Sequence, residues 1–193
     1  MGYRYIWIDS LCIIQDDEKD WQTESGNMCS IFQNAALVVA ATLSADAGGG
    51  CFSSDHYHDS LSHMAVNDLI PIAPLLKRGW VFREGLLASR VSHFLHGELI
   101  WECNTEGLCE CSDWKLGCKP TVVNQNPSPD EIGVTTAYHK LVEDYSCLSL
   151  TFASDKLPGI SGVLKQFHSL REDLLGDYLA GLWRKTLIFD LAW

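Results

Sequence analysis

The stretch from Tyr5 to Asp20, YIWIDSLCIIQDDEKD, constrains the fold more than any other part of the sequence. Its first half is apolar and rich in isoleucine and aromatic residues, which favours a strand buried on both faces. The run holds a single carboxylate, Asp9, and then ends in acidic residues, which suit the start of a helix. We therefore predict a strand over Tyr5–Ile14, followed by an amphipathic helix over Asp17–Asn34.

The middle of the chain adds further strands and a short helix. Ala36–Thr42 (ALVVAAT) has the composition of a second buried strand. A strand, a helix and a strand joined by short connections predict a βαβ unit with a parallel sheet. Gly79–Ser89 has the pattern of a short helix, and Val91–Leu95 and Glu98–Cys103 flank a tight turn typical of a β-hairpin.

The C-terminal part favours helices. Residues 104–135 are rich in cysteine, proline and asparagine without a period, so we expect an irregular excursion there. Two stripes at helical spacing follow, which predict a helix around Tyr138–Tyr145 and a last helix over Tyr178–Leu187. The predicted fold class is α/β: a partly parallel sheet with flanking helices, a β-hairpin and a C-terminal helical segment. The predicted units are residues 1–111, an irregular loop over residues 112–135, and a helical segment over residues 136–193.

Composition limits the classes of function. The chain has 193 residues, enough for one domain with a sizeable core, and a formal net charge of -11. A polyanion repels phosphate backbones, which argues against nucleic acid as a general partner. The first residues lack the pattern of a secretory signal, and no stretch has the length of a membrane span. The eight cysteines are then expected to be reduced thiols, and the protein to be cytoplasmic.

Several blocks of the sequence resemble the fungal heterokaryon incompatibility (HET) domain: YIWIDSLCIIQDD, IFQNAALVVAAT, RGWVFREGLLASRVSHF, ELIWEC and TFASDKLPGISGV. The resemblance implies a role in non-self recognition and programmed cell death signalling. It implies other incompatibility or signalling proteins as partners, and a homo-oligomer as an alternative. Family members usually begin with an earlier strand and continue further, so we expect a domain truncated at both ends, with the first strand missing.

A shorter stretch, Trp80 to Glu84 (WVFRE), resembles the tryptophan–glutamate helix of TIR domains, whose glutamate serves NAD cleavage in the enzymatic members. That resemblance implies TIR-like βαβ elements, Glu84 as a catalytic carboxylate and NAD as a substrate rather than a bound cofactor. A carboxylate fits such a role because glycosidic cleavage passes through an oxocarbenium-like transition state. The alternative is that Glu84 only forms a solvated ion pair with one of the arginines Arg78, Arg83 and Arg90.

The predicted strand end supplies the other candidate residues. Ligands of parallel α/β sheets bind outside the carboxyl ends of the strands, where Asp9, Ser10 and Cys12 are expected. We predict Asp9 as a second catalytic residue, and Ser10, Cys12 and Trp80 as substrate-binding residues. Two alternatives stay open: Asp9 accepts backbone hydrogen bonds to fix a neighbouring loop, and Cys12 packs in the core.

Two groups of potential metal ligands fit metal sites poorly. Structural zinc sites usually present paired C-x2-4-C units. The densest thiol group has other spacings, and the histidine group lies in a loop after three glycines. We therefore expect no metal site and no resident cofactor. The residues concerned are Cys103, Cys109, Cys111 and Cys118 in the first group, and His56, His58 and His63 in the second.

Three functional hypotheses follow from the sequence. The first is an enzyme of cell death signalling that cleaves NAD at Asp9, Trp80 and Glu84. The second is a non-catalytic module that signals by protein interaction or self-assembly. The third is an inactive, truncated fragment.

Overall fold

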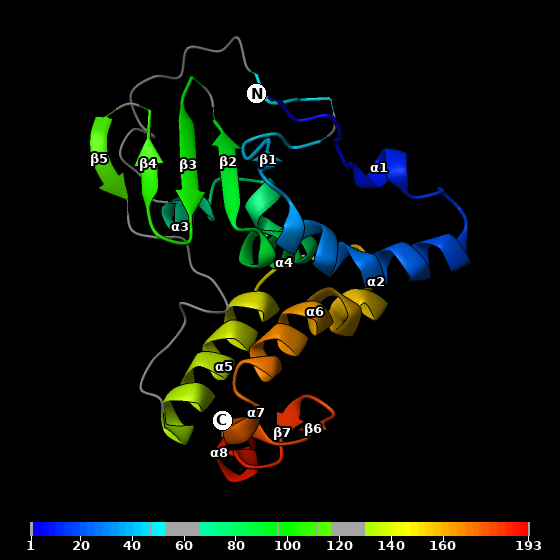
Figure 1. Ribbon diagram of the computed structural model, residues 1–193, viewed down its shortest axis with the longest axis vertical. Coiled ribbons are helices and arrows are strands. Elements are labelled where there is room, and N and C mark those ends of the chain that lie inside the picture. The colour runs from blue at the N-terminus through cyan, green and yellow to red at the C-terminus, as the bar shows by residue number, and fades with distance from the viewer. Residues whose placement is uncertain are drawn as a thin grey trace.

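The computed structural model describes residues 2–46, 48–52, 66–95, 97–110, 112–116 and 130–192. Figure 1 shows the sheet at one end of the long axis, a layer of helices in the middle, and a small hairpin with short helices at the other end. The predicted α/β fold class, with a partly parallel sheet, flanking helices, a hairpin and C-terminal helices, is confirmed.

Helix α2, Glu18–Asn34, forms as predicted, and its start is fixed by the acidic cluster. The side chain of Asp17 accepts the backbone N–H groups of Lys19 and Asp20 at 2.9 and 3.1 Å. This N-cap satisfies two donors that the first helical turn leaves without an intrahelical partner. Met28 and Phe32, one turn apart, bury the apolar face of the helix against the core.

The predicted strand over Tyr5–Ile14 is wrong. Residues 2–8 have no regular secondary structure, Tyr5 and Ile6 are 89% and 80% exposed, and Asp9–Cys12 forms the short helix α1. The acidic residues that follow bind this segment locally, since Asp20 accepts the backbone N–H of Ile14 at 2.7 Å. Such side chain to backbone bonds compete with sheet pairing, which needs a partner distant in the sequence.

One sheet of five strands carries a parallel pair and three antiparallel pairs, in the order β1-β2-β3-β4-β5. Strands β1 and β2 are parallel, and each later strand is antiparallel to the one before it. The predicted hairpin is β2–β3, with Gly97 in its turn at φ 76°. The strands are β1 (Val38–Ala40), β2 (Arg90–Phe94), β3 (Leu99–Cys103), β4 (Gly107–Cys109) and β5 (Ser112–Leu116).

The parallel pair differs from the predicted one. Because Tyr5–Ile14 is not a strand, β1 is the first strand, and its parallel partner is β2. Parallel strands need a long crossover. This crossover contains the helices α3 (Val66–Leu69), η1 (Leu75–Lys77) and α4 (Gly79–Leu87). The predicted helix over Gly79–Ser89 is therefore confirmed as α4, and it lies in the connection between the two parallel strands.

The irregular stretch is shorter than predicted. Strands β4 and β5 and the first turns of a helix fall within residues 104–135. Cys109 in β4 is disulfide-bonded, which contradicts the expectation of a reduced thiol there. Cys12, Cys29, Cys51, Cys103 and Cys147 are free.

Two long helices pack under α4 and α2 and close the main core (Figure 1). They are α5 (Glu131–Ser146) and α6 (Lys156–Ser169), the latter preceded by the short helix η2 (Ala153–Asp155). Glycine residues allow helix α6 to pack closely against its neighbours. A Cβ atom at Gly159 would lie 2.3 Å from the hydroxyl oxygen of Tyr145, and this hydroxyl donates to the carbonyl of Lys156 at 3.0 Å. Only glycine fits this approach without displacing the tyrosine.

The predicted last helix over Tyr178–Leu187 is also wrong. The chain forms α7 (Glu172–Leu175), a hairpin of β6 (Tyr178–Leu179) and β7 (Leu182–Trp183), and α8 (Leu187–Leu191). Ala180 and Gly181 in the turn have φ values of 51° and 102°, which no helix allows.

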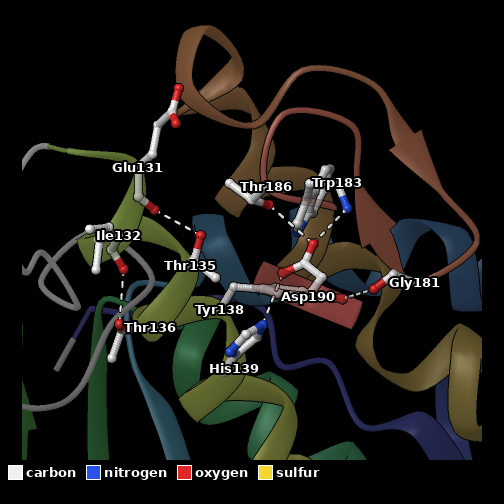
Figure 2. A network of polar contacts seen from close by, with 10 residues as sticks. All are labelled: Glu131, Ile132, Thr135, Thr136, Tyr138, His139, Gly181, Trp183, Thr186 and Asp190. Carbon is white, nitrogen blue, oxygen red and sulfur yellow. Dashed lines mark hydrogen bonds and ion pairs between the residues drawn. The ribbon is translucent and has the colours of Figure 1, made fainter. Parts of the chain in front are cut away.

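A buried carboxylate, Asp190, fastens this C-terminal hairpin to α5 (Figure 2). It accepts hydrogen bonds from the ring of His139 at 2.9 Å, the backbone N–H of Trp183 at 3.0 Å and the hydroxyl of Thr186 at 3.1 Å. Beside it, the hydroxyl of Tyr138 donates to the carbonyl of Gly181. The network joins α5, β7 and α8 through one side chain.

We expect Asp190→Ala to lower the free energy of unfolding by about 3 kcal/mol, because it strips a buried carboxylate from its donors. The matched control is Asp177→Ala, which removes an ion pair with Arg184 whose side chains are both 71% exposed. Loss of that pair should cost about 0–1 kcal/mol. Urea unfolding of the two variants checks this, and equal effects would contradict the role given to Asp190.

Candidate functional site

Helix α4 carries the tryptophan and glutamate singled out in the sequence, one turn apart on the same side of the helix. Trp80 is half-buried and linked to two other elements. Its indole N–H donates to the carboxylate of Asp155 at 3.3 Å, and its ring meets that of Trp21 edge to face, with centroids 6.4 Å apart. Trp80 therefore ties α4 to both α2 and η2.

Glu84 is an unusual carboxyl group. Within the part of the chain that the structure describes, its carboxylate forms no hydrogen bond and no ion pair. Its pKa is raised from 4.5 to about 7, mainly by burial and to a smaller extent by the charge of Asp9, while the charges of Arg83 and Arg78 oppose this rise. The simple solvated ion pair considered for Glu84 is thus not formed. A carboxyl group that titrates near neutral pH suits general acid–base chemistry.

The structure brings Asp9 near Glu84, although for another reason than the predicted strand end. Asp9 is exposed at the first position of α1, and its side chain accepts the backbone N–H of Ser10 at 2.7 Å. Its charge acts on Glu84 and raises the pKa of that carboxyl group, to a smaller extent than burial does. Asp9 and Glu84 are therefore electrostatically linked, although they come from separate elements.

Ser10 and Cys12 are both exposed. The thiol of Cys12 is free and receives the backbone N–H of Ile8 at 3.5 Å, so the alternative that it packs in the core is wrong. In the described part of the chain, neither residue is hydrogen-bonded to Trp80 or Glu84. Their substrate-binding roles stay predictions.

Arg83, considered in the sequence analysis only as an ion-pair partner of Glu84, is a further residue of this region. It is 1% exposed, with its guanidinium carbon 4.4 Å from the centroid of the Trp80 ring. One terminal nitrogen lies 2.7 Å from the sulfur of Met28, and the Nε atom is buried without a hydrogen-bond partner. Burial lowers the pKa of this arginine. The burial of Arg83 could have been predicted from helical spacing, because it lies on the same side of α4 as the buried residues Gly79 and Leu86. We call Asp9, Trp80, Arg83 and Glu84 the α4 site.

A second polar chain lies inside the sheet. The hydroxyl of Thr42 is 2.9 Å from Nδ1 of His93, and Nε2 of His93 is 3.3 Å from the carboxylate of Glu102. The order of hydroxyl, imidazole and carboxylate is that of a nucleophile with its base and orienting acid. Thr42, however, is 0% exposed, so no substrate reaches its hydroxyl. The chain joins the segment after β1 to β2 and β3 and has a structural role.

The candidate metal ligands are described only in part. His56, His58 and His63 lie outside the described residues, as do Cys111 and Cys118. Within the described ranges, no three His, Cys, Asp or Glu side chains are grouped to hold a metal ion. Cys103 is free, and hydrogen bonds from the hydroxyl and backbone of Thr105 lower the pKa of its thiol.

The raised pKa of Glu84 predicts a pH-dependent stability. Between pH 4.5 and about 7 the native protein holds a proton on Glu84 that the unfolded chain has released, so stability falls as pH rises through this window. Glu84→Gln should remove this fall and make the protein more stable than the wild type by about 1–3 kcal/mol at pH 8. Urea unfolding at pH 5 and pH 8 measures it.

The control for this experiment is Glu143→Gln, which removes an exposed carboxylate paired with Lys140. This variant should keep the pH slope of the wild type. A Glu84→Gln variant with the same slope as the wild type would show that Glu84 is ionised at low cost and contradict the burial argument.

Comparisons with known proteins bear on the chain as a whole. Among the described residues, no helix is both long and apolar enough to cross a membrane. The likeness to TIR domains stays a prediction. No curated protein and no solved structure matches the chain.

The family model of the heterokaryon incompatibility protein (HET) matches residues 1–84. The matched range begins before α1, includes α2 and β1, and ends within α4 at Glu84 itself. It therefore contains all four residues of the α4 site. Residues 1–84 of this chain are thus similar to the heterokaryon incompatibility (HET) family.

Proposed function

We propose that this HET-domain protein acts in fungal non-self recognition and programmed cell death signalling, and that its α4 site cleaves NAD. The family match supports the first part. The observation that carries the second part is the carboxyl group of Glu84, whose pKa is raised to about 7 beside a second carboxyl group, Asp9. Cytoplasmic location and partner proteins belong to the same proposal.

The chemistry needs one carboxylate at the reacting carbon. The bond between nicotinamide and ribose breaks, nicotinamide leaves with the bonding electrons, and positive charge develops on the ribose. The carboxylate of Glu84 stabilises that charge, and water then adds to give ADP-ribose and a proton. Asp9 acts as a positioning residue, because its charge sets the fraction of Glu84 that is ionised at neutral pH.

NAD cleavage should depend on Glu84 in cells and in solution. Expression of the protein should deplete cellular NAD, and Glu84→Ala should abolish the depletion. The purified protein should cleave NAD at a rate that rises with pH around pH 7, because the ionised carboxylate is the active form. Asp9→Asn should move this rise to lower pH, because it removes the charge that disfavours ionisation of Glu84.

Asp177→Asn is the control, since Asp177 lies in the exposed ion pair with Arg184, away from α4. It should leave the pH profile unchanged. If cells die while their NAD level stays constant, the enzymatic proposal is wrong.

A second candidate function is a non-catalytic module that signals by self-assembly. The observation that favours it is the row of exposed apolar side chains before and within α1, with Tyr5, Ile6 and Leu11 the most exposed. Contiguous exposed apolar surface is typical of protein interaction sites. Strand β1 lies at the edge of the sheet, and its Val39 is exposed as well.

Self-assembly makes the opposite prediction for mutants. Ile6→Lys should lower the molecular mass measured by light scattering at least twofold and abolish toxicity, whereas Glu84→Ala should leave both unchanged. Ile188→Lys, which changes an equally exposed isoleucine on α8, serves as the control. A monomeric wild-type protein would contradict self-assembly as the function.

A further inference from the structure

We infer that Arg83 is a phosphate-binding residue of the α4 site, held beneath Trp80 and Met28 for the pyrophosphate of a dinucleotide. The identity of the dinucleotide rests on the proposed function. The anion site itself rests on the surroundings of the guanidinium group.

The burial of Arg83 is not balanced by an anion. In the part of the chain that the structure describes, no carboxylate lies within ion-pair distance of its guanidinium. Buried charged groups in folded proteins are normally paired, since an unpaired buried charge is strongly destabilising. Arg83 therefore lacks the anionic partner that a buried guanidinium group normally has.

The groups that do contact Arg83 are weak substitutes. The thioether sulfur of Met28 is a poor acceptor, and the face of Trp80 offers a cation–π contact. The Nε atom has no partner at all. Aromatic and thioether groups shield a guanidinium without neutralising it, so the site keeps its attraction for an anion.

The neighbouring carboxyl group supplies the second half of the site. Glu84 acts on Arg83 through its charge but is not bonded to it. Arg83 and Glu84 are adjacent in the chain and so offer a cation and a carboxylate to two parts of one ligand.

A dinucleotide has this arrangement of charge. Its pyrophosphate is separated from the glycosidic carbon by the rest of the ribose, so one end suits a guanidinium and the other suits a carboxylate. The planar fork of arginine binds phosphate oxygens in pairs, which a lysine ammonium does not. The chemistry of the two side chains thus fits a phosphorylated ribose better than a simple carboxylate.

In this proposal the anion reaches Arg83 by a side-chain movement of Met28. The methionine lies on α2 and covers the guanidinium, with its sulfur 2.7 Å from a terminal nitrogen. Its three rotatable side-chain bonds allow it to turn away while α2 stays in place. The anion would then replace the thioether as the partner of Arg83.

The first test measures binding of inorganic pyrophosphate to the purified full chain by calorimetry at constant ionic strength. We expect binding by the wild type, a loss of at least tenfold in affinity for Arg83→Met, and an intermediate loss for Arg83→Lys. Arg184→Met, which removes an exposed arginine, should bind as the wild type does. Arg83→Met should also fold at least as stably as the wild type without ligand, because it removes an unpaired buried charge.

Inorganic phosphate and NAD are the two further arms of the test. A site for a single phosphate would bind both inorganic anions equally, whereas a dinucleotide site should bind NAD more tightly than either. Glu84→Gln should keep the pyrophosphate affinity within twofold while losing NAD turnover. In turnover, Arg83→Met should raise KM by at least tenfold and change kcat little.

The outcomes separate the two proposals. Pyrophosphate binding that depends on Arg83, without NAD turnover, supports the anion site and overturns the enzymatic function. NAD turnover with a KM that Arg83→Met leaves unchanged overturns the anion site alone. If the wild type binds no pyrophosphate, or if neither Arg83→Met nor Arg83→Lys folds, Arg83 is structural and the inference is wrong.

Discussion

The placement of two consecutive charged residues, Arg83 and Glu84, at the boundary of the core is the constraint on which this structure depends. Helix α4 lies in the crossover between the two parallel strands and packs against α2 and α6. Its partners close over Arg83, whose guanidinium lies against Met28 and Trp80. The same closure withdraws Glu84 from water and sets its proton affinity. The packing of α4 therefore also determines the electrostatic environment of both residues.

The helical elements could be predicted from the sequence because they depend on local information. The acidic cap at Asp17 fixes the start of α2, and the apolar spacing fixes its buried face. The hairpin β2–β3 could likewise be predicted from the tight turn between its strands. Tyr5–Ile14 could not be predicted in this way, because a buried strand needs a distant neighbour, whereas a helix and a side-chain bond to Asp20 need none. The spacing of apolar residues over Tyr178–Leu187 predicts a helix, but the positive φ values of Ala180 and Gly181 form a turn there instead.

The α4 site was predictable in outline but not in its electrostatics. The spacing of Trp80 and Glu84 indicates that they share a helix face, and the structure confirms this. Asp9 acts on Glu84 from the short helix α1, and no strand end is involved. The state of Arg83 depends on Met28 and on the burial of α4 under α2, both remote in sequence. No pattern of spacing reveals that a guanidinium lacks an acid partner.

The close approach of α6 at Gly159 has an evolutionary consequence. The family match ends at Glu84, yet the surface that buries α4 comes from α5 and α6, where the hydroxyl of Tyr145 occupies the space left by the glycine. Recombination that swapped only the first 84 residues between diverged alleles would join an α4 to a complementary surface shaped for another sequence. Such hybrids would survive selection only when both halves keep this fit, so the two parts are expected to be inherited as a linked haplotype.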